Sequence, residues 1–204
     1  MVKTRAEVNS DAEGRVDLEA WVASLPPHVC AEARGDVLRA ARAVAALPEA
    51  ARYARADECL PAGIDIVQIL ADLHLGRDSL VAGMLCSARE QQLLDLDGVE
   101  AGFGASVRRL LEGVERMSAI SALRVERDAP VLGQADGQKD NIRKMLVAMV
   151  DDVRVALIKL AERTRTIRAV KNDEERRLPV AREVFDVYAP LAHRLGIGQI
   201  KWEL

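Results

Sequence analysis

The feature that most constrains this chain is a series of amphipathic segments whose apolar residues recur at helical spacing. Half of the residues are apolar, but only 3% are aromatic. Because β-sheets depend on aromatic and β-branched residues, a chain dominated by Ala, Leu, Val, Glu and Arg favours packed helices. Its 204 residues suffice for one domain with a sizeable buried core. We therefore predict an all-α protein.

Proline, glycine and short polar turns separate the segments that the spacing assigns to helices. The expected helices cover 17–25, 28–47, 48–58, 64–76, 78–94, 99–103, 106–125, 139–170 and 174–194. We expect Asp17, and either Asp78 or Ser79, to cap the helices that they precede. Pro61 and Gly63 are expected to separate two helices, because both residues disfavour a continuous helix.

The predicted organisation is a flexible tail over 1–16, one helical domain over 17–187, and the start of a linker over 188–204. Residues 127–138 are rich in helix breakers and are expected to form a flexible loop. The longest helical pattern is 139–170. Its expected buried face consists of Leu146, Met149, Val153, Leu157 and Leu160.

Charge and cysteine content exclude several classes of protein. With 29 Lys and Arg against 32 Asp and Glu, the net charge is −3, so general nucleic-acid binding is not expected. No apolar run approaches the roughly 20 residues that cross a bilayer. The three cysteines form no CxxC pair, which excludes zinc ribbons and thioredoxin-like sites. Their odd number and the lack of a secretory leader predict reduced thiols and a cytoplasmic protein.

Three segments carry a resemblance to a known family. The longest is the uninterrupted stretch Tyr188–Leu204, and the others are Asn141–Arg154 and Ile158–Arg163. All three resemble signatures of the long RelA/SpoT proteins, which make and destroy the alarmones ppGpp and pppGpp. The resemblance covers about residues 15–204 and is strongest in the last seventy.

The resemblance implies an all-helical bundle of the HD-type phosphohydrolase fold. In bifunctional members of the family this domain holds a manganese ion and removes the 3′-pyrophosphate of ppGpp, while a synthetase domain lies downstream. The chain ends where that synthetase would begin. The resemblance thus implies intramolecular contacts with a synthetase domain, within a ribosome-associated parent that resembles a GTP diphosphokinase.

The family's metal site contains an upstream His, an adjacent His-Asp, a Glu-Asp pair three to four residues later, and a distant Asp followed by His-Asn. This chain contains no His-Asp dipeptide. The corresponding positions are Ala62 for the first His, Cys86 and Ser87 for His-Asp, Glu90 and Gln91 for Glu-Asp, Glu162 for the distant Asp, and Arg165 and Thr166 for His-Asn. One thiol, one hydroxyl and one or two glutamates do not rebuild that site.

We therefore expect no catalytic residue, no metal and no cofactor in this domain, as in the degenerate hydrolase domain of the RelA branch. The expected role is non-catalytic and regulatory. Two alternatives stay open: a metal-dependent ppGpp 3′-pyrophosphohydrolase with unusual ligands, and a helical interaction module unrelated to alarmones.

The remaining polar candidates have simpler interpretations. Among the histidines, His28 is expected to face solvent or pair with Glu32, His74 to lie at a helix C-terminus, and His193 to serve the linker. The basic stretch is expected to be a solvated helix face; it consists of Arg163, Arg165, Arg168 and Lys171. Cys86 is expected to be a small buried residue. Asp151 and Asp152 are neighbours on an expected helix, so their side chains diverge and do not form a metal pair.

Overall fold

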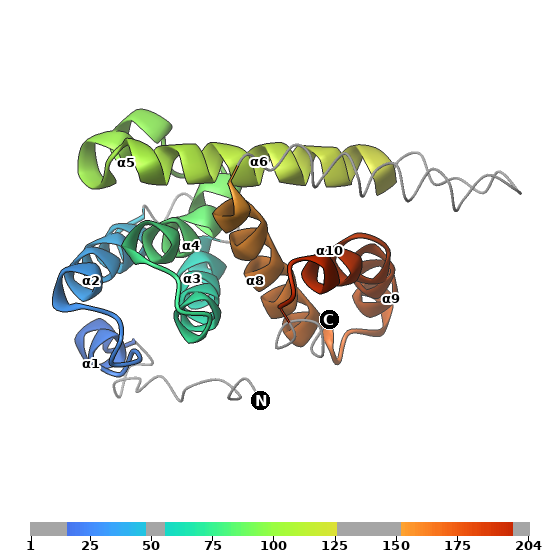
Figure 1. Cartoon of the computed structure of the whole chain (residues 1–204), viewed down its shortest axis with the longest axis horizontal. Coiled ribbons are helices and arrows are strands. Elements are labelled where there is room, and N and C mark those ends of the chain that lie inside the picture. The colour runs from blue at the N-terminus through green and yellow to red at the C-terminus, as the bar shows by residue number, and fades with distance from the viewer. Residues whose placement is uncertain (1–15, 48–55, 126–151, 198–204) are drawn as a thin grey trace, which may run out of the picture. The chain divides into compact units, whose positions relative to one another are not determined.

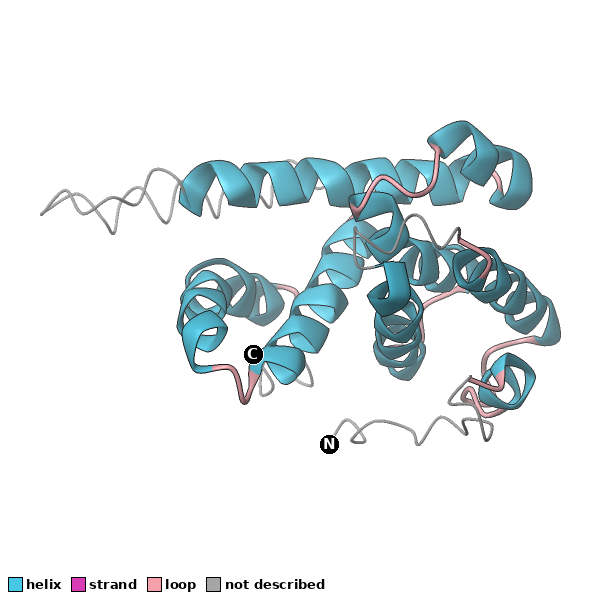
Figure 2. Ribbon diagram, turned by 180° about the vertical axis from the view of Figure 1, so that it is seen from behind, coloured by secondary structure: helices cyan, strands magenta, loops and turns pink. Residues whose placement is uncertain are grey.

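The computed structural model describes residues 16–47, 56–125 and 152–197, and across these ranges the regular elements are helices, without a β-strand (Figures 1 and 2). The predicted all-α class is therefore confirmed. The chain divides into two compact units, residues 1–111 and 112–204. Among the described helices, none combines the length and apolar character needed to cross a membrane.

Helices of the first unit pack mainly around α4. The bounds are α1 (Leu18–Ala23), α2 (Ala31–Ala45), α3 (Ala56–Asp72), α4 (Arg77–Glu90), α5 (Leu96–Phe103) and the first part of α6 (Ala105–Val125). The most extensive helix contacts join α4 to α3 and to α2. Nearly all of α4 from Ser79 to Ala88 is buried, so this helix forms the centre of the unit's core.

The second unit contains the rest of α6 together with α8 (Val153–Val170), α9 (Glu174–Glu183), the π-helical turn η2 (Val184–Tyr188) and α10 (Ala189–Arg194). The sequence predicts one helix over 174–194. The structure has a nearly continuous helical run over these residues, but a π-helical turn interrupts its α-helical hydrogen bonding before Pro190.

Two of the predicted helix starts can be compared directly. Asp17 caps α1 as predicted, because its carboxylate accepts a hydrogen bond of 2.9 Å from the amide of Ala20. The prediction for α4 is wrong: this helix starts after Gly76 without a side-chain cap. Asp78 instead pairs with Arg77, and Ser79 is buried.

Other boundaries also differ from the prediction. Pro61 and Gly63 lie inside α3, which begins at Ala56, so they do not separate two helices. Pro61 is the sixth residue of α3, beyond the first amides that lack intrahelical partners, so the helix continues through it with one internal hydrogen bond fewer. The tail up to residue 15, the expected loop 127–138, and Leu146 and Met149 lie outside the described residues.

The expected helix 139–170 has a boundary inside it. Asp152 has extended backbone angles and caps α8, accepting a hydrogen bond of 2.9 Å from the amide of Arg154. Val153 is then the first helical residue and is 51% exposed, so its predicted place on a buried face is wrong. Leu160 is fully buried, as predicted.

Arg34 on α2 fixes the connection between α1 and α2. Its guanidinium donates five hydrogen bonds of 2.6–2.9 Å to backbone carbonyls at the end of α1 and in the following turn. The acceptors are Val22, Ala23, Leu25, Pro26 and Val29. Because two of these carbonyls belong to α1 and three to the turn that follows, one side chain of α2 ties both segments together.

A second arginine joins α4 to α2. Arg77 at the start of α4 donates to Asp36 of α2 at 2.6 Å and to the adjacent Asp78 at 2.7 Å. The hydrogen bond to Asp78 is the main cause that raises the pKa of the Arg77 guanidinium above its usual value, and Asp36 adds to it against the opposing effect of burial. The guanidinium also donates to the carbonyl of Phe103 at 2.9 Å.

Two glycines bring α3 and α4 close together. A Cβ atom added to Gly63 would lie 2.6 Å from Sδ and 2.7 Å from the backbone oxygen of Met84. A Cβ atom added to Gly83 would lie 2.6 Å from a methyl carbon of Leu70. Because the Met84 oxygen belongs to the backbone, the close approach at Gly63 cannot be relieved by a side-chain rotation alone.

We predict that Gly63→Ala destabilises the first unit by about 1–3 kcal/mol, because the new methyl group overpacks the α3–α4 contact. Gly35→Ala in α2 is the matched control, since nothing lies within 4 Å of its added Cβ. That substitution should stabilise the protein by about 0.5–1 kcal/mol. Urea unfolding followed by circular dichroism measures both changes, and equal stability of the two variants would contradict the close-approach argument.

Candidate functional site

The predicted metal-site positions of the first unit lie on α3 and α4. Ala62 is buried in α3, next to the glycine that contacts α4. Cys86 is buried in α4, as predicted, and its thiol donates to the carbonyl of Gly83 at 3.3 Å. The position of the family's first His thus holds a buried methyl group, and the position of its second His holds a hydrogen-bonded thiol.

The other three positions of this unit lie at the C-terminal end of α4. Ser87 is half-buried, and Glu90, the last helical residue, is exposed. Gln91 follows as the C-terminal cap, and its side-chain oxygen is buried without a hydrogen-bond partner among the described residues. A single neutral amide oxygen is a weak ligand compared with the carboxylate that the family has at this position.

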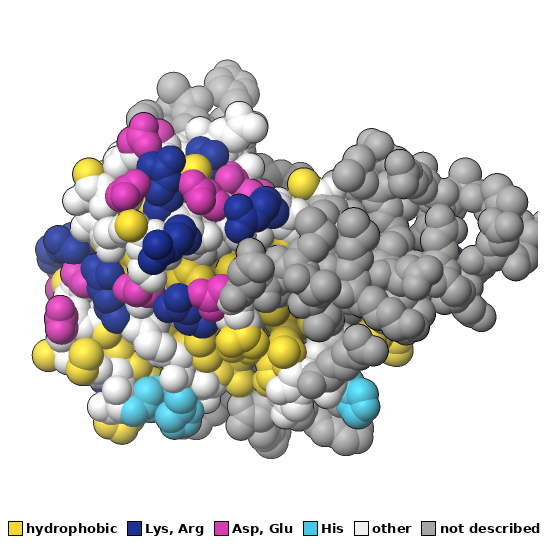
Figure 3. Space-filling view, turned by 45° about the horizontal axis from the view of Figure 1, so that its top comes forward, with side chains coloured by type: hydrophobic (Ala, Val, Ile, Leu, Met, Phe, Trp, Pro, Cys, Tyr) yellow, Lys and Arg dark blue, Asp and Glu magenta, His cyan; other side chains and the backbone are white. Residues whose placement is uncertain are grey.

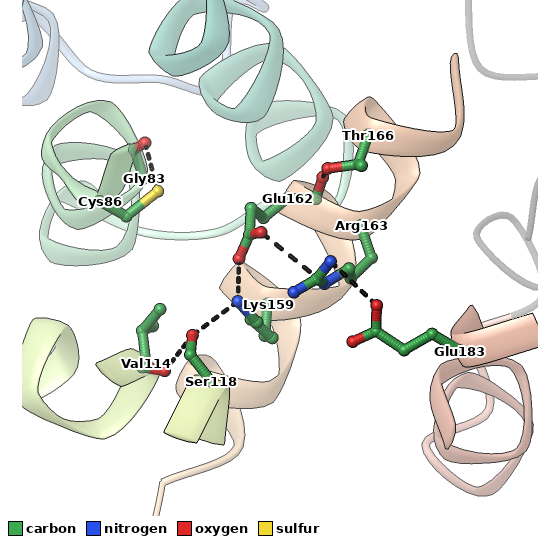
Figure 4. A network of polar contacts seen from close by, with 9 residues as sticks. All are labelled: Gly83, Cys86, Val114, Ser118, Lys159, Glu162, Arg163, Thr166 and Glu183. Atoms are coloured by element: carbon green, nitrogen blue, oxygen red, sulfur yellow. Dashed lines mark hydrogen bonds and ion pairs between the residues drawn. The ribbon is translucent and has the colours of Figure 1, made fainter. Parts of the chain in front are cut away.

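Glu162 lies on α8 in the second unit, at the position of the family's distant Asp. It is 8% exposed, and its carboxylate forms a short ion pair with the ammonium group of Lys159, one turn earlier (Figure 4). The guanidinium of Arg163 approaches the other carboxylate oxygen, with Nε 3.7 Å from Oε1. Glu162 is therefore held between two cationic side chains.

The remaining family position is Thr166, also on α8. Its hydroxyl is half-buried and donates to the backbone carbonyl of Glu162 at 3.0 Å, a bond within the helix itself. The neighbouring Arg165 is half-buried. A guanidinium at the position of the family's imidazole cannot accept a proton or ligate a cation.

A polar network extends from Glu162 on α8 to two other elements of the second unit. The ammonium of Lys159 is fully buried and donates to the hydroxyl of Ser118 on α6 at 2.7 Å. Arg163 donates to the carboxylate of Glu183 on α9 at 3.2 Å. Figure 4 shows these side chains directed toward one another from α6, α8 and α9. We call Ser118, Lys159, Glu162, Arg163 and Glu183 the α8 ion network.

The residues at the family positions do not fit a divalent cation. Ala62 has no donor atom, and a cation placed at Glu162 would meet the ammonium of Lys159 and the guanidinium of Arg163. A metal bound there would take the Glu162 carboxylate away from the fully buried Lys159 ammonium, which is energetically costly. Among the described residues, no three His, Cys, Asp or Glu side chains gather as they would around a metal ion.

The sequence interpretation of the basic stretch is right for part of it. Arg168 and Lys171 are exposed, in agreement with a solvated face. Arg163 is instead half-buried in the α8 ion network. Lys159 is absent from the sequence predictions, although its spacing of three residues from Glu162 could have indicated an ion pair.

Two histidines lie where the sequence predicts and also form a contact that it does not predict. His28 is exposed, as expected, but its ring stacks on His74 with the centroids 4.0 Å apart, and its Nε2 lies 2.8 Å from the carbonyl oxygen of Ala71. His74 follows α3 with a positive φ of 60°. Figure 3 shows histidine side chains side by side on the surface. The two stacked rings are within 12° of parallel. Their nitrogen lone pairs therefore lie in separate planes and do not converge on one metal ion.

Comparison with known proteins identifies the family. The HD domain family matches residues 38–198. The chain belongs to this family. The predicted HD-type helical bundle is therefore confirmed.

This HD domain is similar to named bacterial proteins. It is 38% identical over 192 residues to the GTP pyrophosphokinase of Escherichia coli (strain K12), covering 94% of this chain and 25% of that protein. It is 41% identical over 147 residues to the GTP pyrophosphokinase of Haemophilus influenzae, covering 71% of this chain and 19% of that protein. It is also 41% identical over 144 residues to the guanosine-3′,5′-bis(diphosphate) 3′-pyrophosphohydrolase of Vibrio cholerae, covering 69% of this chain and 19% of that protein.

These matches confirm the resemblance to the RelA/SpoT family, and the chain is homologous to the HD region of its members. It spans about a quarter or less of the length of these curated relatives. Because the relatives carry names for both synthesis and hydrolysis, similarity alone does not distinguish an active HD domain from an inactive one.

We predict that Lys159→Met destabilises the second unit by about 3–5 kcal/mol, because it leaves the buried Glu162 carboxylate without its nearest counter-ion. Adding Glu162→Gln should restore a large part of this loss, since the buried charge is then absent. Lys171→Met, at an exposed lysine that follows α8, should change stability by about 0.5 kcal/mol or less. Urea unfolding measures all three, and a double variant no more stable than Lys159→Met would contradict the ion-pair interpretation.

Proposed function

We propose that this HD domain is a non-catalytic, regulatory region of a RelA-type GTP pyrophosphokinase, which transfers pyrophosphate from ATP to GTP to make (p)ppGpp. The observation that carries the proposal is the state of Glu162. The acidic side chain at the family's metal-ligand position is already neutralised by Lys159 and Arg163. Ala62 and Cys86 support the same conclusion, because a buried methyl group and a hydrogen-bonded thiol replace the family's ligands. Gln91 offers only a neutral amide at the position of a carboxylate.

The proposal includes the domain's partners. Its main partner would be the synthetase domain of the same polypeptide, reached through the segment that begins at Tyr188, and its parent would be ribosome-associated in the cytoplasm. No metal cofactor, membrane contact or direct nucleic-acid contact is proposed for the domain itself. The mixture of basic and acidic side chains visible in Figure 3 agrees with the last point, since a polyanion-binding face gathers one sign of charge.

One observation favours a second candidate, an active 3′-pyrophosphohydrolase with unusual ligands. The Vibrio cholerae relative, 41% identical, carries the name of that activity. Cys86 and Glu90 would then have to supply ligands in place of the family's histidine and carboxylates. An interaction module unrelated to alarmones has less support, because the relatives' names concern guanosine polyphosphates.

We predict that the purified chain does not hydrolyse ppGpp in the presence of Mn²⁺ and does not retain stoichiometric manganese after gel filtration. Cys86→His combined with Ser87→Asp should not restore activity, because Ala62, Gln91 and Glu162 still depart from the ligand pattern. The measurements are pyrophosphate release and metal content by mass spectrometry. Release above a no-enzyme control from the unmodified chain would support the second candidate instead.

We further predict that removing residues 1–180 from the full-length parent changes its rate of (p)ppGpp synthesis or the response of that rate to activators. A regulatory domain acts by favouring one state of its neighbour, so its removal shifts that equilibrium. Circular dichroism and thermal melting of the truncated protein control for a misfolded synthetase. An unchanged rate together with an unchanged response would contradict the regulatory role.

A further inference from the structure

The segment from α9 to α10 contains an unusual turn. In η2 the backbone amide of Ala189 bonds to the carbonyl of Val184, five residues earlier, where an α-helix would use a residue four earlier. The next residue, Pro190, favours this widening. Proline lacks a backbone donor, and in an α-helix its ring crowds the carbonyl four residues before it. Such π-helical turns are rare and often occur at functional sites.

One side chain from α8 contacts both ends of this turn. Arg163 donates to Glu183, which directly precedes η2, at 3.2 Å. Its guanidinium carbon also lies 5.5 Å from the ring centroid of Tyr188, the last residue of η2. The side chains of Arg163 and Glu183 are each 17% exposed, and Tyr188 is fully buried. The two contacts are therefore largely shielded from water, where ion pairs and cation–π interactions are stronger.

Arg163 is itself held in place by the rest of the α8 ion network. Its guanidinium lies near the carboxylate of Glu162, the preceding residue on α8. That carboxylate forms an ion pair with Lys159, which donates to Ser118. The two cations and two carboxylates of the network balance in charge. A guanidinium with partners on both sides has little rotational freedom, so it can fix the distance between α8 and η2.

We infer that Arg163 is a positioning residue that keeps residues 184–188 in the π-helical form and thereby sets the orientation of α10. The π-helical form contains one residue more than the equivalent α-helical turn. Closing it to an α-helix would rotate α10 by about 100° and shift it by about 1.5 Å relative to α9. Glu183 and Tyr188 would then no longer both face Arg163. This inference does not rest on the proposed function, because it concerns the backbone geometry of residues 184–188 and not the reaction of the parent protein.

Spin-label distances test the inference in the 204-residue chain. Labels are placed at Ala169→Cys on α8 and His193→Cys on α10, both at exposed positions. The exposed Cys30 is changed to Ser, while Cys59 and Cys86 are buried and remain. In this background Arg163→Ala is expected to shift the label distance by on the order of 5 Å, or to split it into two populations, because the label on α10 turns with its helix.

Arg182→Ala is the matched control, since it removes an exposed arginine from α9 beside Glu183. It should leave the label distance unchanged. A folded Arg163→Ala variant with the original label distance would overturn the inference. Removing a side chain that only stabilises the unit would lower its stability without moving α10. If Arg163→Ala does not fold, Glu183→Gln decides in the same way: a changed distance supports the inference, and an unchanged one overturns it.

Discussion

A buried lysine on α8 is the constraint on which much of the second unit depends. An ammonium group loses several kcal/mol of solvation when it is fully removed from water, so it must have both a counter-charge and hydrogen-bond acceptors. Lys159 obtains them from Glu162 on its own helix and from Ser118 on α6. Gly113 on α6 also lets α8 approach closely: a Cβ atom added to it would lie 2.6 Å from a methyl carbon of Val155 on α8. Charge and packing thus fix α8 against α6 together.

The same constraint determines what Glu162 can do. The Glu162 carboxylate already has two cationic partners, the Lys159 ammonium and the Arg163 guanidinium. A further cation would compete with them. A metal at Glu162 would compete with the buried Lys159 ammonium for the same carboxylate. This electrostatic argument is independent of Ala62 and Cys86, which belong to the other unit. The two units therefore support the proposed loss of hydrolysis for different physical reasons.

The sequence predicts the helices better than their ends and better than the polar core. Helical spacing of apolar residues identifies the helical segments, and the Asp17 cap follows from local chemistry. Pro61 and Gly63 mislead because both lie inside α3 despite their low helix propensity, and at Gly63 the close packing against Met84 favours a residue without a side chain. The burial of Lys159 could not be predicted from its neighbours in sequence, because it depends on a serine 41 residues away.

The replacements at the family's ligand positions also bear on why such a domain would persist without its chemistry. A metal site keeps several charged or polar groups close together and incompletely hydrogen-bonded, which lowers the stability of the metal-free protein. Ala62 needs no partner, and Cys86 satisfies its weak donor with the nearby Gly83 carbonyl. In the first unit, both small side chains are buried at positions where the family has an imidazole. A domain that serves as a rigid neighbour for other parts of a protein benefits from that exchange, whereas an enzyme that must bind and release a metal-bound substrate does not.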